Sequence, residues 1–244
     1  MKLDDIKKLH QKKYREVHGC FLVEGEHLVL ELQKAAAANR LLQDCELYVT
    51  GKYEHWHSPF KTHPISDRQM AQIAETTTPQ GIVALVPMSA LAALRSASQR
   101  AGERAVYLYQ VQDPGNLGTI LRTLGWFGSF RCLLSPGSVD PYNSKVVRAS
   151  MGAIFHVPIE LDVELGSLHS RFERIASLDM KGESLQSPSF KAFDCYLFGN
   201  EARGVPREQV TALDARAFTI AGCGTIESLN LAAVVNICVY ELSR

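Results

Sequence analysis

The last quarter of the chain, residues 194–244, constrains the fold more than any other stretch. It holds two short β-prone runs, residues 195–198 and 217–220, and a glycine-containing loop directly follows each of them. Two strands that each end in such a loop bring the loops together at the carboxyl edge of a parallel sheet, where open α/β sheets bind ligands. We therefore expect a ligand site at this edge.

The segment that ends the chain, residues 229–242, is apolar on every side of the helix that it would form. Leu231 and Cys238 lie on one side of this helix, whereas Ile237 and Tyr240 lie on another. A helix that is apolar all round is buried rather than laid on a surface. We predict that this helix belongs to the core and also contributes to an interface.

Composition sets only broad limits on the class of protein. With 244 residues, of which 46% are hydrophobic and 21% charged, the chain is typical of a globular protein with one large or two small domains. Its six cysteines include no C-x-x-C pair, which indicates neither a zinc site nor a disulfide framework. No apolar run approaches the ~18 residues of a membrane span, and residues 1–5 lack the apolar core of a secretory signal. We expect a cytoplasmic protein with reduced cysteines, no membrane association and no metal.

The start of the chain is basic although the net charge is zero. Six lysine or arginine residues and only two aspartates fall between residues 2 and 15, around an apolar stripe typical of a helix. One interpretation is a solvated helix face, which is what charge runs usually are. The other is an arm that contacts the phosphates of a nucleic acid. The candidate contacts are Lys7, Lys8, Lys12, Lys13 and Arg15.

Strand and helix patterns alternate twice along the chain, which predicts two α/β domains. The first alternation has strands expected at residues 20–23, 45–50 and 81–86, and helices at residues 26–38 and 66–73, the latter with a capping box at Ser66 and Gln69. A second alternation begins with a strand at residues 105–109. We predict a small domain at residues 1–87, a helical linker at residues 88–104 and a second domain at residues 105–244.

The loop at residues 113–118 follows the first strand of the second domain and opens a helix that runs to about Gly128. Asn116 is well placed either as the N-cap of this helix or as a functional side chain. Arg122, one turn into the helix, points towards the same sheet edge as the glycine loops. The loop matches neither the G-x-x-x-x-G-K-[ST] of a P-loop nor the G-x-G-x-x-G of a dinucleotide site.

These stretches together resemble the motifs of a known family. Residues 113–123 (DPGNLGTILRT) are similar to the first motif of the SpoU (TrmH) family of RNA ribose 2′-O-methyltransferases, within the SPOUT superfamily. Residues 197–206 (LFGNEARGVP) resemble its second motif, and residues 220–230 its third. The segment at residues 143–153 resembles the stretch between the motifs, and residues 1–87 look like the ribosomal-protein-like substrate-binding domain of the family.

The resemblance implies a fold and an activity. The second domain would be a parallel α/β sheet whose C-terminal segment forms a trefoil knot, and the protein would work as a homodimer with the active site near the interface. It would bind S-adenosyl-L-methionine in the knot and methylate a ribose 2′-hydroxyl in RNA. Because of the separate N-terminal domain, rRNA is a better expectation than tRNA.

The motifs also carry site residues over to this chain. The resemblance implies a cofactor pocket that uses mainly backbone atoms of Leu197, Gly199, Asn200, Ile220, Ser228 and Leu229. It implies a catalytic group of Asn116, Arg122, Glu201, Ser228 and Asn230. Two of these residues have other interpretations. Ser228 is also a possible N-cap of the last helix, and Gly199 is expected both to leave space for the cofactor and to allow a positive φ.

The role of Arg122 is open at this point. The family mechanism uses this arginine to take or direct the proton of the ribose hydroxyl, yet a guanidinium has no acceptor site and a pKa above ~12. Stabilisation of the developing alkoxide by a fixed cation is an equally sound role.

The chain departs from the third motif at Ala221 and Gly222, where the family has proline and methionine, and at residues 231–233. None of the candidate catalytic residues is altered, so we expect an active enzyme. One alternative is a SPOUT-fold protein that has lost catalysis and serves as an RNA-binding or ribosome-assembly factor. A conventional Rossmann enzyme acting on small molecules is a weaker alternative, because the glycine fingerprint is missing.

Overall fold

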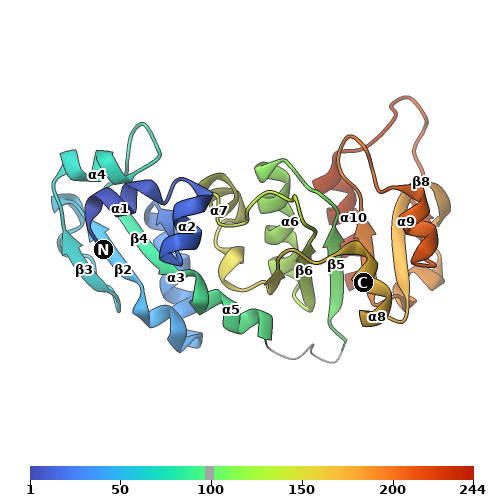
Figure 1. Cartoon of the computed structure of the whole chain (residues 1–244), viewed down its shortest axis with the longest axis horizontal. Coiled ribbons are helices and arrows are strands. Elements are labelled where there is room, and N and C mark those ends of the chain that lie inside the picture. Colours follow the sequence, from blue (N-terminus) through green and yellow to red (C-terminus); the bar gives the residue numbers. More distant parts are fainter. Residues whose placement is uncertain (97–101) are drawn as a thin grey trace. The chain divides into compact units, whose positions relative to one another are not determined.

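The computed structural model describes residues 1–96 and 102–244, which form two compact units. The first unit comprises Met1–Ser96 and Asp140–His156, and the second comprises Ala97–Val139 and Val157–Arg244. Figure 1 shows the helices and strands of both units, coloured along the sequence. The segment Asp140–His156, which comes between the first and second motifs in sequence, therefore packs with the N-terminal half of the chain.

The first unit is built on a four-stranded sheet in the order β1-β4-β2-β3. β4 runs antiparallel to β1 and β2, whereas β2 and β3 are parallel. The expected strands are present, and β3, which the sequence did not predict, is a polar edge strand ending in proline, as edge strands tolerate. The strands are β1 (Cys20–Glu24), β2 (Glu46–Val49), β3 (Lys61–Pro64) and β4 (Ile82–Pro87).

Helices cover both faces of this sheet. α1 and α4 pack on one face around Leu22, Val83 and Leu85, while Phe21 on the opposite face packs against the tilted ring of Tyr142 with ring centroids 4.9 Å apart. Both sequence-predicted helices are confirmed, and the capping box at the start of α4 is formed. The helices are α1 (Leu3–Lys8), α2 (Lys12–His18), α3 (Glu26–Ala38), α4 (Asp67–Ile73), α5 (Met88–Ser96) and α7 (Ser144–Ser150), with the 3₁₀ turns η1 (Arg40–Asp44), η2 (Gly51–Tyr53) and η3 (Ala153–Phe155).

The basic start of the chain forms two short helices, α1 and α2, which are separated by a turn at residues 9–11. Arg15 on α2 corrects the sequence interpretation, because its side chain is only 4% exposed. Its guanidinium donates to the carboxylate of Asp140 at 2.6 and 3.0 Å and to the backbone carbonyls of Leu9 and His10. All of these partners lie in the first unit, so Arg15 is a buried structural arginine and not a phosphate contact.

The second unit is built on a six-stranded sheet in the order β10-β8-β9-β5-β6-β7, in which every neighbouring pair is parallel. A mixed α/β chain with a parallel sheet was expected and is confirmed. The strands are β5 (Arg104–Leu108), β6 (Phe130–Leu134), β7 (Ile159–Glu160), β8 (Ile175–Ser184), β9 (Cys195–Phe198) and β10 (Arg216–Thr219). β8 contains an irregularity, because Ser177 pairs with Ala217 but the next pair joins Glu183 to Phe218.

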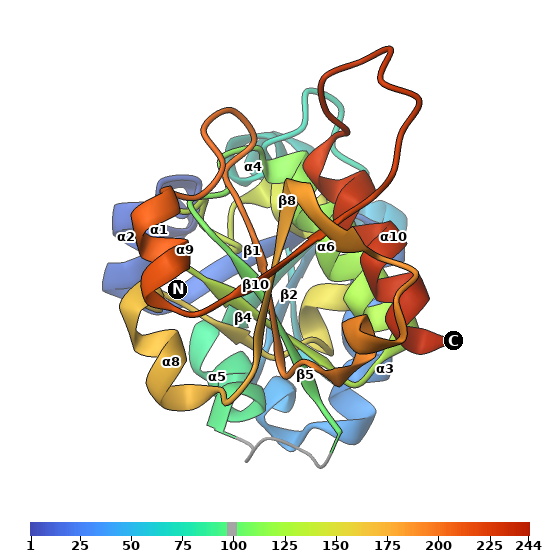
Figure 2. The same cartoon turned by 90° about the vertical axis from the view of Figure 1, so that its right-hand side faces the viewer.

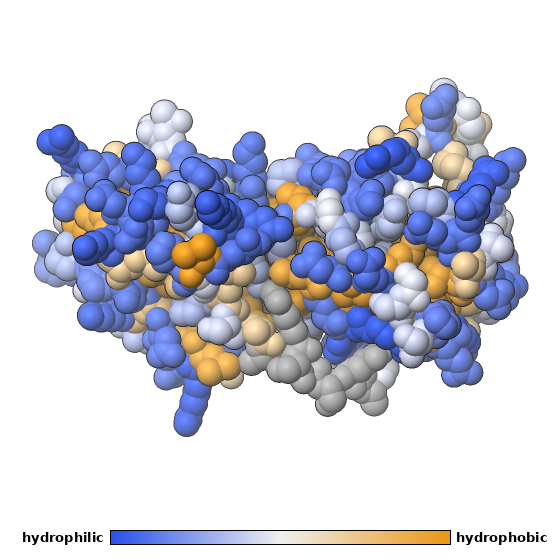
Figure 3. Space-filling view, in the orientation of Figure 1, coloured by the Kyte–Doolittle hydropathy of each residue, from blue (hydrophilic) through white to orange (hydrophobic). Residues whose placement is uncertain are grey.

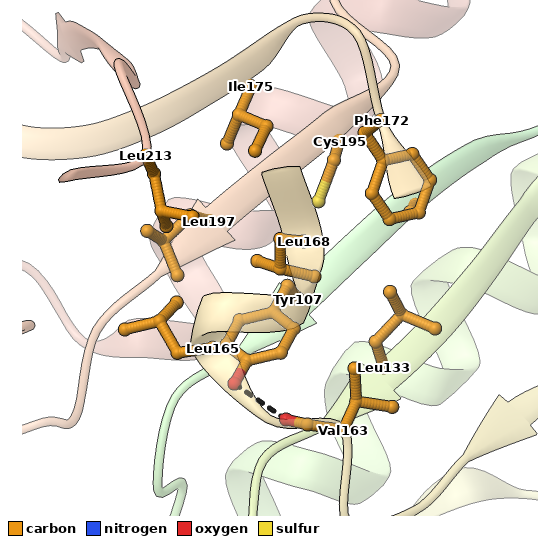
Figure 4. Packing of buried hydrophobic residues seen from close by; sticks show 11 residues of the cluster. Tyr107, Leu133, Val163, Leu165, Leu168, Phe172, Ile175, Cys195, Leu197 and Leu213 are labelled. Atoms are coloured by element: carbon orange, nitrogen blue, oxygen red, sulfur yellow. Dashed lines mark hydrogen bonds between the residues drawn. The ribbon is translucent and has the colours of Figure 1, made fainter. Parts of the chain in front are cut away.

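Helices also cover both faces of the parallel sheet. α6 and α10 lie together on one side and α8 and α9 on the other (Figure 2). The apolar cluster beneath α8 and α9 surrounds Tyr107, whose hydroxyl donates to the carbonyl of Val163 at 2.8 Å (Figure 4). The helices are α6 (Pro114–Phe127), α8 (Leu168–Arg171), α9 (Arg207–Ala212) and α10 (Leu231–Ser243), with the 3₁₀ turns η4 (Leu165–Ser167) and η5 (Pro188–Ala192).

The predicted linker at residues 88–104 is described only in part. It begins as α5, whose Ala90 and Leu91 are buried, and it ends where β5 begins at Arg104. Residues 97–101 lie outside the described residues. The boundaries at residues 87 and 105 remain predictions.

All six cysteines are free thiols. Among the described residues, no helix is long and apolar enough to cross a membrane, and no group of three or more histidine, cysteine, aspartate or glutamate residues is arranged to hold a metal ion.

Candidate active site

The second-motif loop, residues 199–206, is a tight turn at the carboxyl end of β9. The backbones of Asn200 and Gly204 exchange hydrogen bonds of 3.1 and 2.9 Å. A Cβ atom on Gly199 would lie 2.6 to 2.9 Å from backbone atoms of Gly204 and Val205, far inside van der Waals contact. The expected positive φ is found at Gly204 (φ +63°) and not at Gly199. Gly199 is therefore required by the close approach of the two sides of the turn.

The amide of Asn200 ties this loop to the end of β5. Its Nδ2 donates to the carbonyl of Gln110 at 2.7 Å, and its Oδ1 accepts from the backbone N–H groups of Ala202 and Arg203. Only 7% of Asn200 is exposed. The side chain of Asn200 thus holds the shape of the loop, and the loop sets the position of the neighbouring Glu201.

The carboxylate of Glu201 joins the second-motif loop to the first-motif loop at residues 113–118. It accepts from the backbone N–H of Gln112 and of Asp113, each at 3.3 Å, and from Nδ2 of Asn116 at 3.2 Å. The Oδ1 of Asn116 in turn accepts from Nδ2 of Asn230 at 2.9 Å. Three predicted catalytic residues from three separate motifs therefore form one hydrogen-bonded chain, which we call the Asn–Asn–Glu chain.

Chemistry fixes the direction of every bond in the Asn–Asn–Glu chain. At one end, Oδ1 of Asn230 accepts from the N–H groups of Ala232 and Ala233, which can only donate. At the other end, an ionised carboxylate can only accept. Both asparagine amides therefore have a single consistent orientation, and each keeps one N–H that makes no bond within the Asn–Asn–Glu chain. These N–H groups are fixed donors at the loop edge of the sheet.

The helix caps differ from those expected. Asp113, and not Asn116, caps α6, because its carboxylate accepts from the N–H of Asn116 at 2.7 Å. Asn230, and not Ser228, caps α10. The side chain of Asn116 is consequently free of a capping role. Its only partners within the described residues are Glu201 and Asn230.

Comparison with protein families assigns both halves of the chain. The SpoU rRNA Methylase family model matches residues 103–240, more than half of the chain. The chain belongs to the SpoU rRNA methylase family. The MRM3-like substrate binding domain matches residues 2–84.

Individual relatives agree with this membership. The 23S rRNA (guanosine(2553)-2′-O)-methyltransferase RlmP of Bacillus subtilis is 32% identical over 253 residues, with 99% of this chain and 95% of RlmP covered. A solved TrmH-family structure from Porphyromonas gingivalis is similar at a TM-score of 0.81 and 29% identity, covering 98% of this chain and 96% of that one. The AdoMet-bound rRNA methyltransferase of Sinorhizobium meliloti is similar at a TM-score of 0.80 and 26% identity, covering 98% and 93%.

Two of the catalytic residues predicted for this SpoU family chain, Arg122 and Ser228, are not joined to the Asn–Asn–Glu chain. Arg122 is exposed on α6, and no hydrogen bond or ion pair to it is found within the described residues. It lies four residues before Trp126, on the same exposed stripe of the helix. Ser228 is exposed in the loop between β10 and α10, without a partner in the described part of the chain. Their catalytic roles remain predictions.

The predicted SpoU cofactor residues lie on two successive strand ends and the loop that follows. Leu197 is fully buried in β9, and Ile220 immediately follows β10. The third-motif loop, residues 221–230, is exposed along its whole length and projects from the sheet (Figure 2). Ser228 and Leu229 therefore reach a cofactor only if this loop lies over the ends of β9 and β10.

Ser177 is a polar residue at this edge that the sequence analysis missed. It pairs with Leu197 on one side and with Ala217 on the other, level with the predicted cofactor residues. Its hydroxyl is buried and has no hydrogen-bond partner in the described residues. A buried unpaired hydroxyl is costly, which makes Ser177 a candidate for a hydrogen bond to a bound ligand. Its one sequence signal was its place within the short apolar run at residues 175–178, a position that many structural serines share.

The four lysines predicted to contact RNA, Lys7, Lys8, Lys12 and Lys13, are all exposed. The first unit presents a mostly hydrophilic surface over α1 and α2 (Figure 3). Lys8 donates to Asp5 at 2.9 Å, and Lys12 lies 3.7 Å from Glu16. Exposed pairs of this kind are weak and exchange readily with other anions.

Proposed function

We propose that this protein is an S-adenosyl-L-methionine-dependent RNA methyltransferase that methylates a ribose 2′-hydroxyl in ribosomal RNA. The observation that carries the proposal is the Asn–Asn–Glu chain, because it unites side chains from all three SpoU motifs at one sheet edge. The AdoMet-bound relative from Sinorhizobium meliloti and the rRNA specificity of RlmP support the cofactor and the substrate class.

The residues at this edge fit the cofactor. The buried unpaired hydroxyl of Ser177 and the strand ends at Leu197 and Ile220 offer polar and backbone groups beside an apolar wall. We assign cofactor contacts to Leu197, Gly199, Asn200, Ile220, Ser228 and Leu229 and add Ser177 to them. When bound, the cofactor supplies an electrophilic methyl group on a sulfonium.

Asn116, Asn230 and Glu201 position the ribose, and Arg122 stabilises the negative charge that develops on the attacking ribose oxygen. The spare N–H groups of Asn116 and Asn230 are held in fixed directions and are suited to donate to ribose oxygens. Glu201 acts through Asn116 and the two backbone N–H groups that it accepts from, so it is a positioning residue. Arg122 supplies a cation to the developing alkoxide and the adjacent phosphate, which is the role that its chemistry permits.

The position of Arg122 supports a homodimer. Arg122 shares its helix face with Trp126, which is 83% exposed, and the neighbouring Phe127 packs edge-on against Tyr240 of α10. Together with Ile237, these apolar residues form a surface that we call the α6–α10 patch: Trp126, Phe127, Ile237 and Tyr240. Exposed apolar surface of this kind marks an interaction site. A second copy on this patch would bring Arg122 to the interface, beside the motif loops.

A trefoil knot and a cytoplasmic location complete the proposal. β10 pairs with β8 at one edge of the sheet, while α10 returns to pack against α6 beside the motif loops. This return path is what a knotted SPOUT chain requires. The free thiols agree with a reducing compartment, in which ribosomal RNA is also found.

The proposal is tested by methyl transfer from labelled S-adenosylmethionine to undermethylated rRNA and, separately, to tRNA. We expect label in rRNA, recovered after nuclease digestion as a 2′-O-methylnucleoside. Label on a base, or label in tRNA alone, would contradict the proposal. RNA binding without any transfer would favour the alternative, an inactive RNA-binding or assembly factor.

A further inference from the structure

Ser177 is the last residue of β8 that pairs with both neighbouring strands. It lies opposite Leu197 of β9, where that ladder ends, and opposite Ala217 of β10, after which the pairing is interrupted. In the described part of the chain, the residues that follow, 178–182, pair with neither β9 nor β10, and we call them the β8 excursion. The sheet therefore opens directly after Ser177.

The side chain of Ser177 points to the face of the sheet that α8 and α9 cover. Ile175, two residues earlier on the same strand, belongs to the apolar cluster on that face, as does Leu197 on the neighbouring strand (Figure 4). Side chains two residues apart in a strand lie on the same face. Val205 of the second-motif loop also packs against this cluster. Ser177 thus shares its face of the sheet with the loop that follows β9.

The hydroxyl of Ser177 is a polar group in an apolar setting. Only 4% of Ser177 is exposed, and its hydroxyl has no hydrogen-bond partner within the described residues. Ser135 and Ser150 are buried as well, but each uses its hydroxyl in a hydrogen bond. A hydroxyl buried without a partner destabilises the protein. A ligand that supplies the missing partner would remove this cost.

We propose that the hydroxyl of Ser177 binds the adenine base of S-adenosyl-L-methionine and helps to select that base. The methionine end of the cofactor is charged, and burying its charges beside Ile175 and Leu197 without counter-charges would be costly. The ribose needs several hydrogen-bond partners, whereas Ser177 offers one. Adenine combines two apolar faces with an edge on which the 6-amino group lies between the ring nitrogens N1 and N7. A hydroxyl, which can donate and accept, suits any of these groups.

The β8 excursion gives adenine a route to this hydroxyl. Protein atoms cover the hydroxyl, so a ligand reaches it only when a covering segment moves. The excursion is suited to move, because it lacks strand partners and its residues 179–182 are exposed. It returns to the sheet at Gly182, where a Cβ atom would lie 2.6 Å from the backbone of Ala217. The excursion therefore crosses beside the strand pair that holds Ser177.

The inference rests on the proposed function, because it takes S-adenosylmethionine as the cofactor. It goes further by naming the part of the cofactor that Ser177 contacts and the property that this contact confers, which is selection of the base.

The first test compares Ser177→Ala with wild-type full-length protein, with S-adenosylhomocysteine as the calorimetric probe. We expect the dissociation constant to rise by about 5-fold, as for loss of one hydrogen bond. The melting temperature of the protein without the probe should be unchanged or higher, because a methyl group replaces an unpaired buried hydroxyl. A lower melting temperature with unchanged affinity would show that the hydroxyl is structural and would overturn the proposal.

The control for Ser177→Ala is Ser170→Ala in the same unit. It removes an exposed hydroxyl that donates to the carbonyl of Ser167 at 2.8 Å. Ser170→Ala should leave the dissociation constant for S-adenosylhomocysteine at its wild-type value. An equal loss of affinity in the two variants would overturn the proposal.

Base analogues of S-adenosylhomocysteine test whether the contact is made to adenine. The analogues lack N1, N7 or the 6-amino group, and a fourth, which lacks N3 beside the ribose, is the control. For one of the first three analogues, the difference in affinity between wild type and Ser177→Ala should disappear, because the partner of the hydroxyl is missing. For the analogue without N3, the difference should remain. The same difference for all four analogues would overturn the proposal.

Methylation of rRNA separates the failure of this inference from the failure of the proposed function. If the protein methylates rRNA and Ser177→Ala equals wild type in its affinity for every probe, the adenine assignment alone is overturned. If Ser177→Ala shows the expected losses but wild-type protein transfers no methyl group, the proposed function fails and the adenine assignment stands.

Discussion

At the scale of single residues, the site is held by side chains that act on one another. Asn116, Asn230 and Glu201 come from three motifs that are far apart in sequence, and each has its orientation set by the next. Arg122 is the exception, because it is exposed and has no partner within the described residues. A positively charged group without a local partner, close to such a site, is suited to a charged substrate.

The first prediction concerns Arg122→Ala. We expect the dissociation constant for S-adenosylmethionine to stay within a few-fold, since Arg122 lies on α6 and the assigned cofactor residues lie on other elements. The single-turnover methylation rate should fall by ~10²–10³, the range for removal of a preorganised charge-stabilising donor. Arg122→Lys should recover little, because lysine lacks the planar fork.

The control for Arg122 is Arg174→Ala, an exposed arginine elsewhere in the same unit. Arg174→Ala should leave both the dissociation constant for S-adenosylmethionine and the single-turnover methylation rate near their wild-type values. If Arg122→Ala loses cofactor binding, or turns over at nearly the full rate, then Arg122 is structural and its catalytic assignment is wrong.

The second prediction concerns Gly199→Ala. Even this small side chain would meet the backbone of Gly204 at 2.6 Å, so the second-motif loop must open. We expect calorimetry to show loss of S-adenosylmethionine binding, together with a lower melting temperature. Gly222→Ala is the control, because a Cβ there meets nothing within 4 Å. Normal cofactor affinity in Gly199→Ala would mean that the loop is not part of the cofactor site.

At the scale of elements, α10 exposes an apolar face that packing within one chain does not cover. α10 buries one face, including Val235, Cys238 and Val239, but leaves Ile237 and Tyr240 exposed at 39% and 57%. From the sequence, we predict that this helix belongs to both a core and an interface. The buried face confirms the first expectation, and the second stays a prediction.

The third prediction is that the α6–α10 patch forms the homodimer. Light scattering at micromolar concentration should show a dimer, and Trp126→Glu combined with Tyr240→Glu should convert it to a monomer, because charge is excluded from the core of such interfaces. Val17→Glu, which alters an apolar residue in the first unit that is 68% exposed, should leave the dimer intact. A wild-type monomer under these conditions would contradict the proposal.

The fourth prediction concerns the lysines of α1 and α2. Replacing Lys7, Lys8, Lys12 and Lys13 together by glutamine should weaken RNA binding and flatten its dependence on salt. The log–log slope should change by roughly 0.7–0.9 for each phosphate that the variant no longer neutralises, and cofactor affinity should not change. A pair of exposed lysines of the same unit, changed as Lys34→Gln and Lys61→Gln, is the control. An unaltered salt slope would show that these lysines are only a solvated helix face.

At the scale of the whole molecule, neither compact unit is continuous in sequence, because the segment Asp140–His156 packs with the first unit. Tyr142, Val146, Val147 and Phe155 lie between the first and second motifs, yet they are buried within the first unit. A cut in the linker therefore separates an apolar segment from the surface that covers it.

The fifth prediction follows from this arrangement. Protein that lacks residues 1–103 should bind a hydrophobic dye such as ANS and aggregate, because the apolar side chains of residues 140–156 lose their cover. The full-length protein should do neither. A truncated protein that stays monodisperse and keeps its S-adenosylmethionine affinity would instead support the boundary predicted at residue 105.

The sequence by itself predicted many of the strands and helices and the motif loops that carry the candidate site residues. The apolar run at residues 195–198, which ends in a glycine loop, predicted the parallel strand β9, because a strand buried on both faces has few alternatives. The resemblance to the SpoU motifs implied Asn116, Glu201 and Asn230 as site residues, and the structure brings these three together. These features depend on local pattern, which a single chain carries in full.

Only the tertiary structure decided which polar groups were available for function. Arg15 had the appearance of a surface cation, yet Asp140, more than a hundred residues away, binds it in the first unit. Ser177 was one serine among many until sheet pairing placed its buried hydroxyl beside Leu197. Whether a side chain is paired or free depends on partners that are distant in sequence, and no local pattern encodes them.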